Sequence, residues 1–487
     1  NRLDLGGTNC VCDAACASSL SALSMAVAEL QLGHSDLVIT GGVDTLNDIF
    51  MYLCFSKTPA LSPTGDCRPF SDQADGTMLG EGLGMVALKR LEDAEREGDR
   101  IYAVIRGVGS SSDGRSKSVY APVPAGQAKT LAPAYELAGY GPETVELVEA
   151  HGTGTKGGDV AGFEGLRLVF DAAGREDRQW CALGSVKSQV GHTKAAAGAA
   201  GLFKAVLALH HGVLPPTIKV GAPNPKLGLP DSPFYLSTKA RPWVRDARHP
   251  RRASVSAFGF GGSNFHVALE EYRGPAPRAA RFGTLAKEMV VVCGDDVAQV
   301  ASKARDLAKE WAGVAGASRL AALARERQEG YRPDASARLA VLAADGDDLA
   351  KKLLEAAKRI EAAPMEAFSL PDGTAYGTGR NEGKVAFLFP GQGSQYVGMG
   401  ADLAMSFRTA LDVWDRAANL DLEEGTPLHE VVFPRPGFGE EKEKRDLARL
   451  TATQWAQPAI ACASLAQLAL LEEAGVRPDL VGGHSLG

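Results

Sequence analysis

The sequence predicts layered α/β domains, and three observations carry that prediction. With 487 residues, 45% of them hydrophobic and 23% charged, the chain exceeds the ~250 to 300 residues that one hydrophobic core usually holds. Short β-branched runs alternate with Ala-rich stretches over residues 1–272, as in layered α/β proteins. Two stretches of linker composition, residues 273–283 and 364–384, interrupt this pattern. We therefore expect three domains, at residues 1–272, 273–383 and 384–487.

Each region has its own predicted elements. In the first, we expect strands at residues 37–40, 85–88, 102–105 and 145–148, and a helix at residues 195–211. In the second, two strand-helix units at residues 289–311 and 339–360 predict a small α/β linker domain. The third opens on a buried-strand pattern at residues 385–389, which runs into a Gly-rich turn, PGQGS, at residues 390–394.

Composition excludes several classes of protein. The net charge is −7 and both signs are interspersed, so neither nucleic acid nor an anionic membrane is an expected partner. No apolar run approaches the ~18 residues of a membrane span. The chain begins at Asn1 rather than Met and stops inside a motif, so we expect it to be part of a longer protein.

The cysteines indicate a reducing compartment. They have no regular framework of spacings, which predicts free thiols in a cytoplasmic protein. The cluster near the start lacks paired C-x-x-C spacing and a nearby histidine, so no metal is expected. The eight are Cys10, Cys12, Cys16, Cys54, Cys67, Cys181, Cys293 and Cys462.

One cysteine has the setting of a nucleophile. The segment DAACASSL, residues 13–20, places Cys16 just ahead of apolar residues at helical spacing. At the start of a helix, the partial positive charge and free N–H groups favour a thiolate, so we expect a reactive Cys16 with a lowered pKa. Taken alone, a cysteine among small residues is more often part of the core.

Two histidine motifs strengthen this interpretation. His151 lies in EAHGTGT, residues 149–155, directly after a predicted strand and on a loop of Gly and Thr. His192 lies in KSQVGHT, residues 187–193, between a strand-like run and the Ala-rich helix. Two histidines at strand ends beside glycine loops indicate a site rather than two structural residues.

These three motifs, in this order, resemble the β-ketoacyl synthase (condensing) family of fatty acid and polyketide synthases. The resemblance implies a thiolase-like fold in which Cys16 takes an acyl chain from a carrier-protein thioester. It implies that His151 and His192 promote decarboxylation of a malonyl thioester and the condensation that follows. Imidazole N–H donors converging on the enolate oxygen would stabilise it.

The same resemblance assigns further residues. Lys187 matches the lysine that orders the site, and Thr153 and Thr155 match threonines that bind the phosphopantetheine arm. In SAFGFGGSN, residues 256–264, glycines interrupt a strand pattern. Phe260 in this loop matches the residue whose N–H joins that of Cys16 in holding the thioester oxyanion, and its side chain is a candidate gate to the acyl tunnel.

Within that family, residues 54–70 and 110–117 most resemble iterative type I synthases such as those making polyunsaturated fatty acids. Only 15 residues precede Cys16, whereas the family's domain begins well before its cysteine. The condensing domain is therefore expected to lack its first strands and helices, and to expose sheet edges and apolar surface.

The end of the chain carries a second nucleophile motif. Residues 480–487, LVGGHSLG, predict a strand entering a Gly-x-Ser-x-Gly turn with Ser485 at its apex. Together with FPGQGSQ, residues 389–395, the turn resembles malonyl-type acyltransferases with an α/β-hydrolase-like fold. That resemblance implies oxyanion N–H groups from Gln392 and Leu486. The family's histidine and arginine lie after the serine, so we expect Ser485 to be inert in this chain.

The resemblance also implies partners. An acyl carrier protein or domain would bring phosphopantetheine, acyl and malonyl thioesters, and a homodimer is expected, with no cofactor bound in this chain. Two alternatives remain open: a thiolase acting on coenzyme A esters, and a non-catalytic scaffold of the condensing fold. The two His-Gly motifs argue against the first alternative, and the presence of Cys16 argues against the second. The starter, the extender unit and the product are not encoded in these motifs.

Overall fold

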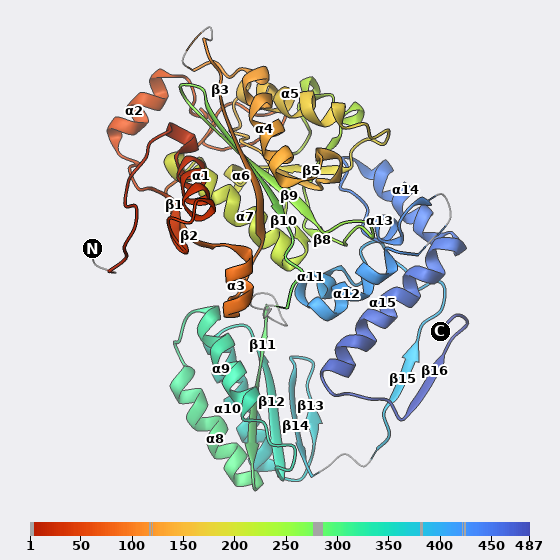
Figure 1. Ribbon diagram of the computed structural model, residues 1–487. Helices are drawn as coiled ribbons and strands as arrows, with labels where there is room; N and C mark the ends of the chain where they lie inside the picture. The colour runs from red at the N-terminus through yellow and green to blue at the C-terminus, as the bar shows by residue number, and fades with distance from the viewer. Residues whose placement is uncertain are drawn as a thin grey trace. The chain divides into compact units, whose positions relative to one another are not determined.

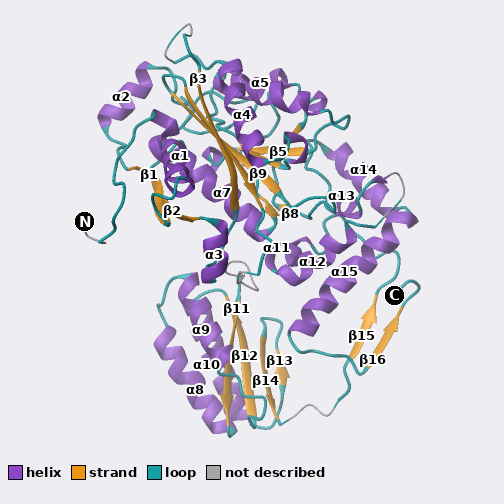
Figure 2. Cartoon of the chain, viewed as in Figure 1, coloured by secondary structure: helices purple, strands orange, loops and turns teal. Residues whose placement is uncertain are grey.

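The structure is a computed structural model that describes residues 4–115, 118, 120–275, 286–379, 383–420, 422 and 425–487. It divides into two compact units, one of residues 1–281, 388–476 and 482–487, the other of residues 282–387 and 477–481. Most of the expected linker at residues 273–283, residues 116 and 117 of the segment compared with iterative synthases, and residues 380–382 of the second linker lie outside the described residues. Both units mix helices and strands, as the sequence predicts (Figures 1 and 2).

A mixed sheet organises the first unit. Its strand order is β3-β10-β9-β4-β5-β7, with β9, β4, β5 and β7 parallel to one another and β10 antiparallel to both neighbours. The strands are β3 (Val104–Ser112), β4 (Leu147–Glu149), β5 (Cys181–Gly184), β7 (Phe234–Leu236), β9 (Arg252–Gly259) and β10 (Ser263–Glu270). Because β9, β4 and β5 are adjacent and parallel, the loops after them meet at one edge of the sheet.

Helices cover both faces of this sheet. On one face, α4 and α5 form a core that includes Leu131, Phe163 and Leu183. On the other, α1 and α7 form a second core around Leu20 and Leu202. The helices of this region are α1 (Ser18–Gln31), α2 (Ile49–Lys57), α3 (Leu91–Glu97), α4 (Pro124–Ala138), α5 (Gly158–Phe170), α6 (Lys187–Val190) and α7 (Ala197–His211). This is the predicted layered α/β arrangement.

Two short antiparallel pairs accompany the main sheet. The first joins β1 (Leu37–Asp44) to β2 (Gly82–Lys89), with Gly41 opposite Met85. The second joins β6 (Val213–Leu214) to β8 (Arg241–Pro242). Near the first pair, α2 begins where the Asp48 carboxylate accepts the N–H of Met51, and it buries none of its residues. The β1–β2 pair and α2 therefore present apolar side chains to solvent.

The second unit is a four-stranded antiparallel sheet of order β11-β12-β14-β13 with helices packed against it. Figure 2 shows α8, α9 and α10 along the sheet. The elements are β11 (Glu288–Gly294), α8 (Val297–Trp311), α9 (Ala317–Glu329), β12 (Ala337–Ala343), α10 (Gly346–Ala362), β13 (Phe368–Ser369) and β14 (Thr374–Thr378). Both predicted strand-helix units are present. The side chains of Asp296 and Asp345 cap α8 and α10 by accepting N–H groups of their first turns.

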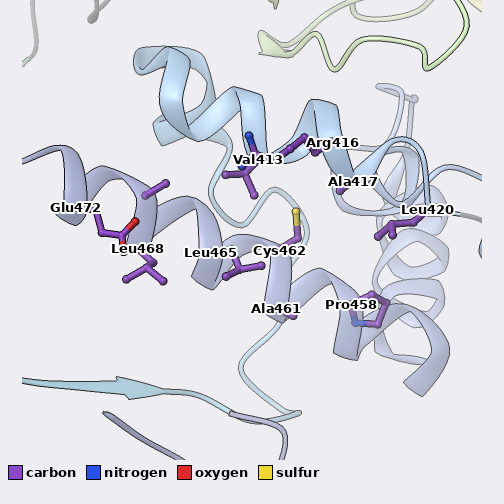
Figure 3. Close-up of a pocket in the computed structure, with 11 residues that line it drawn as sticks. Val413, Arg416, Ala417, Leu420, Pro458, Ala461, Cys462, Leu465, Leu468 and Glu472 are labelled. Carbon is purple, nitrogen blue, oxygen red and sulfur yellow. The ribbon is translucent and has the colours of Figure 1, made fainter. Parts of the chain in front are cut away.

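The last part of the chain is mainly helical. Trp414, Leu411 and Trp455 are among its buried residues. Its elements are β15 (Ala386–Phe389), α11 (Ala401–Ser406), α12 (Arg408–Ala417), α13 (Leu428–Val432), α14 (Glu440–Thr451), α15 (Thr453–Glu473) and β16 (Leu480–Gly483). An apolar groove of about 470 Å³ runs between α12 and α15, with Cys462 in its wall (Figure 3). None of the predicted site residues lines it. Across the described residues, no helix is both long and apolar enough to cross a membrane.

Candidate active site

Cys16 lies in a tight turn that the local sequence builds. A short 3-10 helix, Ala15–Ala17, holds it directly before α1. The Asp13 carboxylate accepts the N–H of Ala15 at 2.8 Å, and the Ser18 hydroxyl accepts the N–H of Ala14 at 2.9 Å. Ala15 has a φ of +50°, a left-handed conformation that is unfavourable for a residue with a side chain. These hydrogen bonds therefore hold the nucleophile on a strained turn.

His151 follows β4, at the sheet edge where the parallel strands end. The Lys187 ammonium, on α6 just after the neighbouring strand β5, donates to the carbonyl of His151. The next residue, Gly152, has a φ of +32°, and a Cβ there would lie 2.8 Å from the Cβ of Ser185 and 3.0 Å from the Phe70 ring. Only glycine fits this close approach, which explains the His-Gly sequence.

Both backbone groups of His192, the N–H and the carbonyl, form hydrogen bonds. Its N–H donates to the carbonyl of Met78 at 2.7 Å, and its carbonyl accepts the N–H of Gly80 at 3.0 Å. The preceding Gly191 has a φ of +73°, which lets the chain turn sharply out of α6. His192 is 3% exposed, so the ring position is set by the packed interior.

The structure brings the two imidazoles together. Their ring centroids are 5.5 Å apart, and the ring planes meet at 81°. The Nδ1 atom of His151 accepts the N–H of Phe258 at 3.3 Å, and Nδ1 of His192 accepts the N–H of Lys194 at 3.1 Å. A neutral imidazole that accepts at Nδ1 carries its proton at Nε2. Both rings are therefore N–H donors through Nε2.

Burial keeps both rings neutral. It lowers the pKa of His151 well below the usual value, and the charge of Lys187 and the neighbouring His192 act in the same direction. The pKa of His192 is also lowered well below the usual value, first by burial and then by Lys187 and Lys194. At neutral pH the site therefore holds two neutral N–H donors, which suit an oxygen that gains negative charge during a reaction.

The expected thiolate of Cys16 is not what the structure favours. Cys16 is 6% exposed, and burial raises the pKa of its thiol above the usual value. Lys187 and the backbone N–H groups of Phe260 and Cys16 lower that pKa, and they do not overcome burial. Desolvation outweighs the helix end because an isolated thiolate is poorly stabilised away from water. The resting nucleophile is therefore a thiol.

The backbone of Phe260 lies next to the side chain of Cys16. It follows β9, the strand next to β4, and its N–H faces the Cys16 sulfur. Its ring is 42% exposed and lies 6.2 Å from the ring of Phe55 and 5.5 Å from that of Tyr120. The backbone of this residue thus faces the nucleophile, and its side chain joins an aromatic group at the surface of the site.

Thr153 and Thr155 lie side by side in the loop that follows His151. Their hydroxyl oxygens are 2.8 Å apart, and Thr155 also accepts the N–H of Gly158 at 3.2 Å. Hydroxyl groups can both donate and accept hydrogen bonds. Both threonines come from the segment that carries His151, which fixes their distance from the reactive groups.

Ser485 occupies a strained turn at the end of β16. Its φ is +57°, and residues 481–487 are exposed. A Cβ on Gly391 would lie 2.9 Å from the Cβ of Ser485, so the PGQGS turn contacts the serine turn directly. Gln392 donates through its side chain to Thr453 at 3.2 Å, and Leu486 is 40% exposed. The two predicted motifs of this region are thus adjacent.

Two buried acids near the site carried no signal in the sequence. Asp159, in the first turn of α5, accepts the N–H of Phe70 at 2.7 Å and that of Gly154 at 3.0 Å, and burial raises its pKa to about 6. Glu149 pairs with Lys204 at 2.9 Å. These carboxylates connect the residues around His151 to Phe70 and Lys204, which are distant in the sequence. The spacing of residues along the chain does not predict such contacts.

Comparisons with known proteins agree with this geometry. Four family descriptions match: "Beta-ketoacyl synthase, N-terminal domain" at residues 1–94, "Beta-ketoacyl synthase, C-terminal domain" at 102–221, "Ketoacyl-synthetase C-terminal extension" at 223–332 and "Acyl transferase domain" at 386–487. The matches follow one another along the chain, and the match to the C-terminal extension begins at residue 223 and ends at residue 332.

Two curated relatives illustrate the match. One of the subunits of the polyunsaturated fatty acid synthase of Thraustochytrium sp. is 38% identical over all of this chain, which spans 18% of that relative. The polyketide synthase GfsA from Streptomyces halstedii is also 38% identical over 99% of the chain, which spans 6% of it. The chain thus covers only a small part of these relatives.

Solved structures show the same fold. The oxazolomycin ketosynthase domain OzmH KS7 of Streptomyces albus is 30% identical with a TM-score of 0.56, over 90% of this chain and 70% of that one. The ketosynthase from module 6 of the bacillaene synthase of Bacillus subtilis is 34% identical with a TM-score of 0.53, over 75% and 60%. These matches confirm the thiolase-like fold class. The chain therefore belongs to the β-ketoacyl synthase family of type I polyketide and polyunsaturated fatty acid synthases, and its last region is part of an acyltransferase domain.

Proposed function

We propose that Cys16, His151 and His192 catalyse the decarboxylative condensation of a malonyl thioester with an acyl chain held on Cys16. The observation that carries this proposal is the pair of neutral imidazoles with Nε2–H groups able to donate, together with Lys187, whose charge acts on both rings and on the buried Cys16 thiol. A general base would need one ring to accept a proton at Nε2, whereas here both rings are donors. Stabilising an enolate needs donors.

In the first step, the Cys16 sulfur attacks the carbonyl carbon of an acyl thioester. The N–H groups of Cys16 and Phe260 hold the oxyanion that forms. The carbon–sulfur bond to the carrier then breaks, and the proton of the Cys16 thiol leaves with the carrier sulfur. Because the thiolate is the attacking form, the raised pKa of Cys16 opposes this step, and Lys187 with the N–H groups of Phe260 and Cys16 offsets part of that effect.

In the second step, the malonyl thioester loses carbon dioxide and its bonding electrons form an enolate. The Nε2–H groups of His151 and His192 donate to the enolate oxygen. The enolate carbon then attacks the thioester carbonyl on Cys16, and the Cys16 thiolate leaves as the carbon–carbon bond forms. Lys187, which lowers the pKa of the Cys16 thiol, stabilises that leaving thiolate.

We further propose that a carrier protein or domain delivers both thioesters through phosphopantetheine, bound at Thr153 and Thr155. The region would act as a homodimer, as the resemblance to the condensing family implies. In the last region, Ser485 would take the malonyl group in the intact acyltransferase. All eight cysteines are free thiols, which supports a cytoplasmic location.

The proposal is tested on the intact gene product by measuring three steps separately. These are acylation of Cys16 by mass spectrometry, carbon dioxide release from a malonyl thioester, and formation of the β-ketoacyl product. Cys16→Ala should abolish acylation and condensation. His192→Ala should reduce carbon dioxide release by about 100-fold or more while acylation continues. Full acylation at another residue in Cys16→Ala, or unchanged decarboxylation in His192→Ala, would contradict the proposal.

A further inference from the structure

A buried lysine lies two residues after His192, outside the set that the sequence motifs assign. The side chain of Lys194 is 6% exposed, and lysine is rarely buried unless it is paired. Its ammonium lies 3.0 Å from an Asp44 carboxylate oxygen, and it donates to the Asn47 side-chain oxygen at 2.6 Å and to the Gly80 carbonyl at 3.0 Å. The three hydrogens of the ammonium thus match three oxygen partners.

The backbone of Lys194, unlike its side chain, contacts the His192 ring. Its N–H is the group that donates to Nδ1 of His192, and its φ is +49°. The left-handed region is unfavourable for a residue with a side chain. Such a conformation persists only where the surroundings over-determine it. The buried ammonium contacts supply that constraint, because they fix the far end of the same residue.

The partners of Lys194 also hold the histidine loop. Gly80 accepts from the Lys194 ammonium through its carbonyl, and its N–H donates to the carbonyl of His192. Asp44 accepts the N–H of Ala195 at 3.3 Å with its second oxygen. The end of β1, the segment before β2 and the His192 loop are therefore joined through one ion pair, in which the Lys194 side chain is 6% exposed and that of Asp44 13%.

We propose that Lys194, held by Asp44, is a positioning residue that fixes the tautomer and direction of the His192 ring for decarboxylation. This inference rests on the proposed function, since it concerns the donor role of His192. It separates the two histidines, because Nδ1 of His151 accepts the N–H of the strand residue Phe258, whereas Nδ1 of His192 accepts the N–H of Lys194, a loop residue whose side chain is paired with Asp44. The positive charge of Lys194 acts in the same sense, by lowering the pKa of His192.

The chain contains a matched control. Lys219 also has a left-handed backbone, with a φ of +67°, and its ammonium lies 2.6 Å from a carboxylate oxygen of Asp66. Its side chain is 37% exposed, and neither histidine ring contacts it through a hydrogen bond in the described part of the chain. Lys219→Gln therefore removes an ion pair and a charge without touching His192.

The experiment compares Lys194→Gln, Asp44→Asn, their combination and Lys219→Gln in the intact gene product. Carbon dioxide release from the malonyl thioester is measured beside acylation of Cys16. Lys194→Gln should lower the rate of carbon dioxide release about 10- to 100-fold, since small misplacement of a catalytic group has effects of that size. Acylation should change less than about threefold. The double variant should be no worse than Lys194→Gln alone, because the two residues act as one unit.

Equal losses in both steps would show a merely structural role and overturn the inference, as would an unchanged rate of carbon dioxide release. If Lys194→Gln does not fold, Asp44→Asn gives the same comparison, because it leaves the ammonium in place without its charge partner. His192→Ala, measured in parallel, separates the two proposals. An unchanged rate of carbon dioxide release in His192→Ala would contradict the proposed function. A strongly reduced rate in His192→Ala, together with an unchanged rate in Lys194→Gln, would contradict this inference alone.

Discussion

Cys16 and Ser485 both lie on strained turns, yet their surroundings differ. A left-handed residue precedes Cys16, at Ala15, and Ser485 is itself left-handed. Cys16 is buried, with Lys187 and the N–H of Phe260 acting on its sulfur, whereas Ser485 lies in an acyltransferase domain of which this chain holds only part. The backbone of the serine turn contacts the PGQGS turn. A strained turn thus presents a nucleophile, but the enclosure around it decides its protonation and its donors.

The largest effect is expected from adding a side chain to the tightly packed loop that follows His151. Gly152→Val should lower the condensation rate by more than about 100-fold and destabilise the protein by roughly 2 to 4 kcal/mol, because the new side chain meets Ser185 and Phe70. Gly157→Ala is the matched control, since nothing lies within 4 Å of a Cβ at that position. Activity assays and thermal unfolding check both variants. Unchanged activity and stability in Gly152→Val would show that the loop is not tightly packed.

The second test concerns the thiol. Because burial raises the pKa of Cys16 above 9.0, iodoacetamide at pH 7 should label the exposed Cys10 and Cys54 at least about 10-fold faster than Cys16. The Cys16 rate should rise with pH up to that raised pKa. Time-resolved peptide mass spectrometry measures all three. Faster labelling of Cys16 at pH 7 would restore the helix-end thiolate expected from the sequence.

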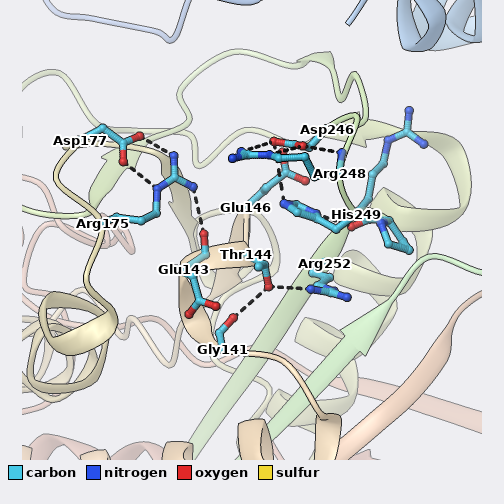
Figure 4. A network of polar contacts seen from close by, with 12 residues as sticks. Gly141, Glu143, Thr144, Glu146, Arg175, Asp177, Asp246, Arg248, His249 and Arg252 are labelled. Carbon is cyan, nitrogen blue, oxygen red and sulfur yellow. Dashed lines mark hydrogen bonds and ion pairs between the residues drawn. The ribbon is translucent and has the colours of Figure 1, made fainter. Parts of the chain in front are cut away.

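The third and smallest test compares the two ends of β4. His151 follows this strand, whereas Glu146 precedes it in a polar network with Trp243, Asp246 and Arg248 nearby (Figure 4). Burial is the main cause that raises the pKa of Glu146 from 4.5 to about 7. The folded state then binds a proton that the unfolded state releases, so this carboxyl lowers stability as pH rises from about 4.5 to 7.

Glu146→Gln removes that dependence and keeps an oxygen that can accept the Trp243 N–H. Relative to the parent, the variant should gain about 1 kcal/mol between pH 4.5 and pH 8, after allowance for partial solvent screening. Denaturant unfolding at the two pH values measures the difference, and a pH-independent difference would contradict the shifted pKa. Activity should follow that of the parent, because Glu146 lies at the strand end away from His151.

Much of the fold followed from local pattern. The strands predicted at residues 37–40, 85–88 and 385–389 fall within or overlap β1, β2 and β15, and the helix predicted at 195–211 corresponds to α7. Those elements have short, regular apolar patterns. The strand predicted at residues 102–105 continues as β3 to Ser112 through small and polar residues. The apolar pattern did not predict the full length of β3, because pairing with β10 extends this strand through residues that are not hydrophobic.

The site was predictable in its residue types and not in its electrostatics. Motif spacing identified Cys16, His151 and His192, because a nucleophile and donors at loop ends leave recognisable glycine and small-residue neighbours. The direction of the Cys16 pKa shift was predicted wrongly. A helix end is visible in the sequence, whereas the burial that raises the Cys16 pKa exists only in the folded chain.

By itself, the sequence determined the α/β layering and the family, since these follow from hydrophobic periodicity and short motifs. Only the tertiary structure decided which nitrogen of each imidazole carries the proton, how deeply the thiol is buried and that Lys194 reaches Asp44 across 150 residues of chain. Hydrogen-bond partners and desolvation arise where distant segments meet. Their consequences for chemistry therefore exist only in the folded chain.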